Sequence, residues 1–125
     1  MSYDIDLIGP NGEIVCVGSH EEGVAYVLGG SNRASLNVTW NYSWFYYKFL
    51  DTEKGIRWLY GKTCAECIPK LEAALKELDT PDYFGSGTRR YEKDYWAPTT
   101  GNAAHALRIL LSWSKEHPEA HFDGD

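Results

Sequence analysis

The stretch ASLNVTWNYS, residues 34–43, decides the fold because apolar and polar side chains alternate along it without a break. Apolar residues occupy the even positions, and Ser, Asn and Thr occupy the odd ones. Successive side chains of a strand point to opposite faces, so this period of two predicts a strand with one buried face. Its other face would carry only uncharged hydroxyls and amides.

The segments before this stretch predict further strands. Residues 3–8 alternate apolar and acidic side chains, which indicates a half-buried strand. Residues 9–12, GPNG, have turn chemistry, so residues 13–17 are expected to return beside the first strand as a hairpin. Residues 24–28 are a short apolar run that ends at two glycines, and we expect a third strand there.

The segments after it predict helices. Apolar spacing favours two short helical pieces within residues 44–50 and 56–60. Thr63 and Glu66 form a capping-box pattern, and the apolar side chains behind them repeat at helical spacing until a Thr-Pro pair. A last helix is expected over residues 102–116, with Thr-Thr-Gly before it and His-Pro after it.

These elements predict one α+β domain over residues 1–125, with a small antiparallel sheet of three to four strands and helices packed on one face. A length of 125 residues is close to the commonest size of a single domain. Hydrophobic residues make up 43% of the chain, an ordinary value for globular proteins that argues against disorder. Residues 79–98 are expected to form one long loop.

Composition excludes several classes of partner. Nucleic-acid binding needs a basic face, whereas this chain has a net charge of −6, so no nucleic acid is expected. No apolar run is long enough for a membrane span, and the first residues do not resemble a secretory signal. Three cysteines, an odd number, fit reduced thiols, so we expect a cytoplasmic protein.

No motif names a reaction, and the sequence predicts no catalytic residue, no cofactor and no metal. Glycine-rich phosphate loops, nucleophile elbows and zinc-protease motifs are absent from the sequence. Cys64 and Cys67 open a helix as a redox pair does, but burial as inert thiols is the better interpretation. Metal chelation or, more simply, a frayed acidic tail would explain His117, His121, Asp123 and Asp125.

The uncharged stripe of residues 34–43 is the first half of a candidate ligand site. Asn37, Thr39 and Asn41 would recognise polar edges of a ligand, and Tyr42 would stack on it. The alternative is a plain solvent face with ordinary cross-strand pairs.

The second half is the aromatic segment before the last helix, whose N-terminus could hold an anion. The alternative here is an ordinary cap with a hydrophobic staple. Neither half contains a charged side chain, so we expect the two to lie side by side and share one concavity. The residues assigned to this second half are Tyr95, Trp96, Thr99, Thr100, Asn102 and His105.

Residues 29–42 and the later DYW and TGNA runs, residues 94–96 and 100–103, resemble small uncharacterised proteins encoded by phages and prophages. The resemblance implies a protein of the host cell cytoplasm. The leading hypothesis is a non-enzymatic binding protein for a small polar ligand such as a nucleotide, for example a counter-defence protein that sequesters a signal. The alternatives are a protein-binding inhibitor of the anti-defence or toxin-immunity type, acting on a host protein, and a small enzyme; homo-oligomerisation stays open.

Overall fold

A computed structural model describes residues 2–16, 25–27, 34–78 and 98–125. Its strands are β1 (Ser2–Ile8), β2 (Ala25–Val27), β3 (Ser35–Thr39) and β4 (His121–Gly124). Its α-helices are α1 (Ser43–Phe49), α2 (Cys64–Leu78) and α3 (Thr100–Glu116), and its 3-10 helices are η1 (Trp40–Tyr42) and η2 (Gly55–Leu59). The predicted α+β class is confirmed.

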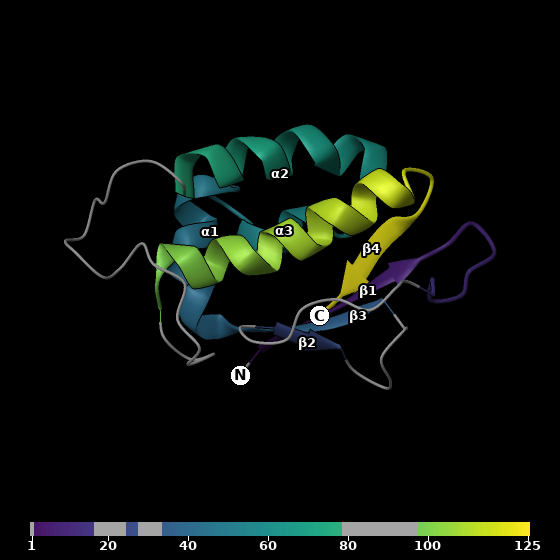
Figure 1. The fold of residues 1–125 in the computed structure, drawn as a ribbon, viewed down its shortest axis with the longest axis horizontal. Helices are drawn as coiled ribbons and strands as arrows, with labels where there is room; N and C mark the ends of the chain where they lie inside the picture. Colours follow the sequence, from purple (N-terminus) through teal and green to yellow (C-terminus); the bar gives the residue numbers. More distant parts are fainter. Residues whose placement is uncertain (1, 17–24, 28–33, 79–97) are drawn as a thin grey trace.

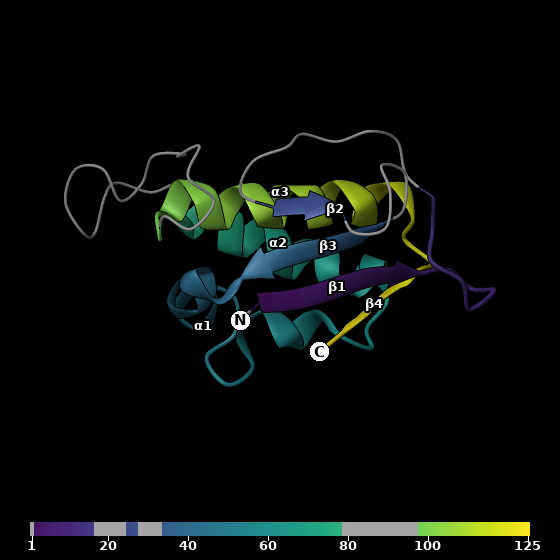
Figure 2. The same cartoon turned by 90° about the horizontal axis from the view of Figure 1, so that it is seen from below.

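The strands form one antiparallel sheet in the order β2-β3-β1-β4. In β1, alternate side chains are buried (Tyr3, Ile5 and Leu7), as the period of two predicts. The helices α2 and α3 pack against each other and cover one face of the sheet (Figures 1 and 2). The apolar side chains of the sheet therefore point into a core shared with both helices.

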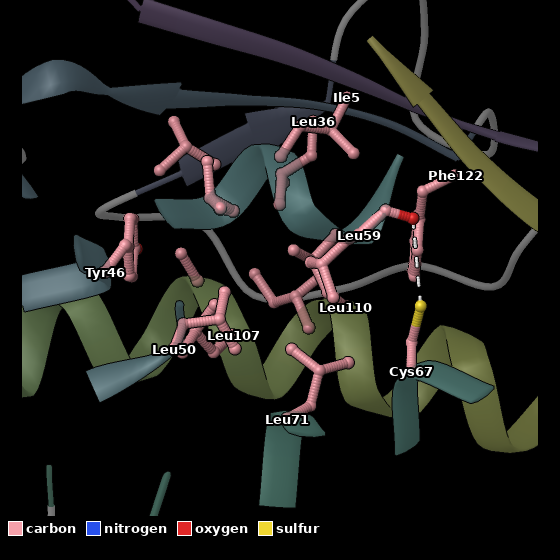
Figure 3. Packing of buried hydrophobic residues seen from close by; sticks show 14 of the residues in the cluster. Ile5, Leu36, Tyr46, Leu50, Leu59, Cys67, Leu71, Leu107, Leu110 and Phe122 are labelled. Atoms are coloured by element: carbon pink, nitrogen blue, oxygen red, sulfur yellow. Dashed lines mark hydrogen bonds between the residues drawn. The ribbon is translucent and has the colours of Figure 1, made fainter. Parts of the chain in front are cut away.

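Figure 3 shows this core, in which side chains distant in sequence meet between the layers. The helix α2 begins as predicted, because the Thr63 and Glu66 side chains each accept a hydrogen bond from the other residue's backbone N–H, at 3.3 and 3.4 Å respectively. The core residues labelled in Figure 3 include Ile5, Leu36, Leu71, Leu107, Leu110 and Phe122.

The strand predicted over residues 34–43 ends at Thr39, so its second half was predicted wrongly. The Thr39 hydroxyl accepts a hydrogen bond from the Asn41 backbone N–H at 3.3 Å and thereby caps η1, which leads directly into α1. Tyr42, Phe45 and Tyr46 are buried at helical spacing. Beyond Thr39, helical packing of aromatics prevails over the alternating pattern.

The predicted hairpin over residues 3–17 forms only in part. The turn is present, since the Gly9 N–H donates to the Glu13 carbonyl at 2.8 Å and Gly12 has a φ of 82°. Beyond the turn there is an isolated bridge between Ile8 and Ile14, and no strand occurs in described residues 9–16. Most of β1 instead pairs with β3 on one side and β4 on the other, and residue 17 lies outside the described residues.

The C-terminal residues form β4, so the interpretation as a frayed tail is wrong. Leu7 of β1 lies opposite Phe122, whose side chain is fully buried. The outer side of β4 is also bonded, because the Gly61 N–H donates to the Phe122 carbonyl at 2.8 Å. The C-terminal segment is thus part of the sheet and of the core.

Candidate functional site

The polar face of β3 is engaged in pairs across the sheet. The Asn37 side-chain amide donates to the Ser2 hydroxyl at 2.6 Å and to the Asp4 carboxylate at 2.7 Å. The Ser35 hydroxyl donates to the Asp6 carboxylate at 2.6 Å. The acidic side chains of β1 are therefore the partners of this stripe, which matches the alternative of ordinary cross-strand pairs.

The start of α3 is built as a helix cap. The Thr99 hydroxyl accepts from the Asn102 backbone N–H at 3.0 Å, and Thr99, Thr100 and Asn102 are all buried. The Tyr46 hydroxyl of α1 donates to the Ala103 carbonyl at 3.0 Å and ties α1 to this end of α3. These groups therefore fix the position of α3 against its neighbour.

The structure brings only part of the two halves of the predicted site together. Leu36 and Val38 point into the core, so Asn37 between them points to the face of the sheet away from α2 and α3 (Figure 2). The start of α3 instead contacts η1 and α1. The predicted shared concavity therefore does not include Asn37.

The remaining assigned residues are distributed around the contact of η1 and α1 with α3. Asn41 is exposed and His105 is half-buried. Tyr42 is fully buried and meets Tyr46 edge-on, with ring centroids 6.4 Å apart, so its ring belongs to the core. The other two assigned residues, Tyr95 and Trp96, lie outside the described residues.

The structure contains an exposed aromatic surface that was not predicted from the sequence. Trp40, Trp44 and Tyr47 are 38%, 53% and 37% exposed, and we call these three side chains the aromatic corner. They come from η1 and α1, at one end of the sheet (Figures 1 and 2). Their separations of four and three residues place them on one helical face, and this spacing could have identified them had a helix been assumed.

Two cations lie against the aromatic corner. The Lys48 ammonium is 5.3 Å from the centroid of the Trp44 ring. The Arg57 guanidinium carbon is 5.7 Å from the Trp40 ring, and its Nε donates to the Asp125 backbone carbonyl at 2.9 Å. Cation–π contacts of this kind contribute about 0.5–1 kcal/mol at exposed sites and hold the charge in place.

The two helix thiols are buried, as predicted. Cys64 and Cys67 have no exposed surface, and the Cys67 thiol lies 3.8 Å from the Leu59 carbonyl, which it can reach as a weak donor (Figure 3). Burial raises the pKa of Cys67 from an ordinary 9.0 to about 12, and it raises that of Cys64 as well. Such thiols stay protonated at neutral pH and are poor nucleophiles and poor metal ligands.

The raised pKa of Cys67 predicts a loss of stability in alkali. The folded state keeps this proton more tightly than the unfolded state, so the stabilisation is complete below pH 9 and disappears as the pH rises toward 12. We expect the free energy of unfolding to fall less steeply between pH 9 and 11 in Cys67→Ala than in the wild type. Denaturant titrations in reducing buffer measure both slopes. Equal slopes for Cys67→Ala and the wild type would contradict the prediction.

Two further classes of site were searched in the described part of the chain. No group of three or more His, Cys, Asp or Glu side chains there could hold a metal ion. None of the helices in these residues is both long and apolar enough to cross a membrane.

Compared with protein-family models, curated proteins and solved structures, the chain matches none of them significantly.

Proposed function

We propose that the chain is a non-enzymatic binding protein and that it binds another protein through the aromatic corner. The observation that carries this proposal is the joint exposure of Trp40, Trp44 and Tyr47 on one helical face. Trp and Tyr are enriched at protein interfaces and supply most hot spots, because each buries a large area with few rotatable bonds. In the setting that the phage resemblance implies, the partner is a host protein of the cytoplasm.

A small polar ligand, such as a nucleotide, has less support from the geometry. Small-ligand sites are concave and offer polar groups that converge on the ligand. Asn37 is bonded to β1, while Thr39 and Thr99 cap helices. A ligand would have to compete with these internal hydrogen bonds, whereas a protein partner needs only the side chains of the corner.

The test is capture of a stoichiometric partner from cytoplasmic extract by the immobilised protein. Replacing both Trp44 and Tyr47 with alanine should reduce retention of that partner about tenfold or more, since hot-spot truncations cost roughly 2 kcal/mol or more each. The matched control replaces Glu72 and Lys115, an exposed ion pair between α2 and α3 with an N–O distance of 3.7 Å, and should retain the partner. Equal retention by both double variants would contradict the proposal, as would a wild type that retains no protein and is stabilised by a nucleotide.

A further inference from the structure

The aromatic corner is locally cationic in an acidic chain. Residues 40–50 contain one charged side chain, Lys48, and the next cations along the chain are Lys54 and Arg57, although the whole chain has a net charge of −6. Lys48 and Arg57 both lie against rings of the corner. The positive charges are therefore part of this surface.

The acidic side chain that follows α1 is engaged locally. The Asp51 carboxylate accepts from the Lys54 and Glu53 backbone N–H groups at 2.8 and 3.1 Å and lies 3.8 Å from the Lys70 ammonium. The N–H of Lys54 contributes most to a lowered Asp51 pKa, so this group stays ionised and committed to the turn. Glu53 is exposed on the same turn and is the nearest acid in sequence that remains.

Other acidic side chains gather elsewhere, on the sheet. Asp6 of β1 and Asp123 of β4 are directly opposite in register, and Asp4 lies against Asp125, whose carboxylate accepts from the Asp4 backbone N–H at 3.0 Å. The aromatic surface on η1, α1 and η2 therefore meets the acidic residues of β1 and β4 at Arg57, whose Nε donates to the Asp125 backbone carbonyl, whereas Lys48 lies against Trp44.

On the premise that the corner binds a protein, we infer that its partner is an acidic segment that also carries apolar side chains. The apolar side chains pack on Trp44 and Tyr47, and carboxylates approach Lys48 and Arg57. A neutral or basic partner would remove water from the exposed Lys48 ammonium without supplying an ion pair, which is costly. An acidic partner replaces that water with ion pairs.

A second copy of the chain fits this surface poorly. In a two-fold symmetric dimer through the corner, the same patch would face itself, because such interfaces are isologous. Lys48 and Arg57 of one copy would then approach the same cations of the other. Charge therefore favours a different, acidic chain as the occupant.

The inference is tested with two fluorescent synthetic peptides of equal length and identical Leu and Phe positions, one with Glu and one with Lys elsewhere. Fluorescence anisotropy measures binding at about 0.15 M salt, where charges more than about 8 Å away are screened and the net charge of −6 contributes little. The acidic peptide should bind the wild type, and the basic one should bind at least tenfold more weakly. Lys48→Glu should raise the Kd of the acidic peptide about tenfold relative to Lys76→Glu, an exposed position on α2 with the same change in net charge.

The outcomes separate the inference from the function on which it rests. Equal binding of the two peptides, absence of binding by both, or equal effects of Lys48→Glu and Lys76→Glu would overturn the acidic partner. If Trp44 and Tyr47 were then still needed to capture the partner from extract, the protein-binding function would stand without the charge preference. Loss of acidic-peptide binding in the Trp44→Ala variant, with Lys76→Glu unaffected, would support both.

Discussion

Replacing Phe122 with alanine is expected to lower the free energy of unfolding by about 3–5 kcal/mol, as for other Phe→Ala changes in cores. The ring is fully buried and meets side chains from the sheet and the helices (Figure 3). Phe122 lies in β4, the outermost strand on one side of the sheet, and is opposite Leu7 of β1. The alanine variant therefore loses packing at the point where β4 joins the core.

Denaturant unfolding followed by far-UV circular dichroism measures this loss. Phe122→Leu keeps most of the volume and should cost under about 1.5 kcal/mol. A loss below about 1 kcal/mol in Phe122→Ala would contradict the position of β4 in the core, because a side chain on a frayed tail contributes little.

Local patterns predicted the elements whose signals are independent of distant contacts. The alternation in residues 3–8 predicted β1, and the Thr63–Glu66 pair predicted the start of α2. The last helix begins two residues earlier than expected, because Thr99, the first residue of the predicted start segment, is its cap. In these elements, the local hydrogen bonds and the apolar period indicate the same structure.

The elements that were missed depend on tertiary contacts. An acidic C-terminal segment with one Phe gives a weak strand signal, and β4 forms because its partner β1 presents an unpaired edge and a core site for that ring. Residues 13–17 have a clearer strand pattern, yet β3 and β4 already pair with most of β1. Whether a segment pairs with β1 depends on which other segments pair with the same edge. The sequence of one segment alone therefore does not predict its pairing.

The aromatic corner was not predicted from the sequence for a related reason. Alternation through residues 40–43 is compatible with a strand and with a helical turn, and the buried rings of Tyr42, Phe45 and Tyr46 favour the helix. That change of structure turns Trp40 and Trp44 into neighbours on an exposed face. The partners of Asn37 were also hidden from the sequence, because they depend on the register of β3 against β1.

The close pairing of β1 with β4 requires a residue without a side chain at position 124. Gly124 lies opposite Ile5 of β1. A Cβ at this position would clash with the Asp4 backbone carbonyl and would lie 2.8 Å from Cζ and 2.9 Å from the hydroxyl of Tyr60. The carbonyl belongs to β1, an inner strand of the sheet, and cannot rotate away as a side chain can.

Gly124→Ala is therefore expected to cost about 1–3 kcal/mol, the usual range for overpacking, even though alanine suits a strand better than glycine does. Chemical denaturation measures the loss, and hydrogen exchange should show faster exchange of the Gly61 amide, which donates to Phe122 of the same strand. Asp123→Ala is the matched control. Its side chain is exposed and opposite Asp6, so its removal should leave stability within about 0.5 kcal/mol or raise it by relieving like charges. If Gly124→Ala were as stable as Asp123→Ala, β4 could not lie as close to Asp4 and Tyr60 as the structure places it.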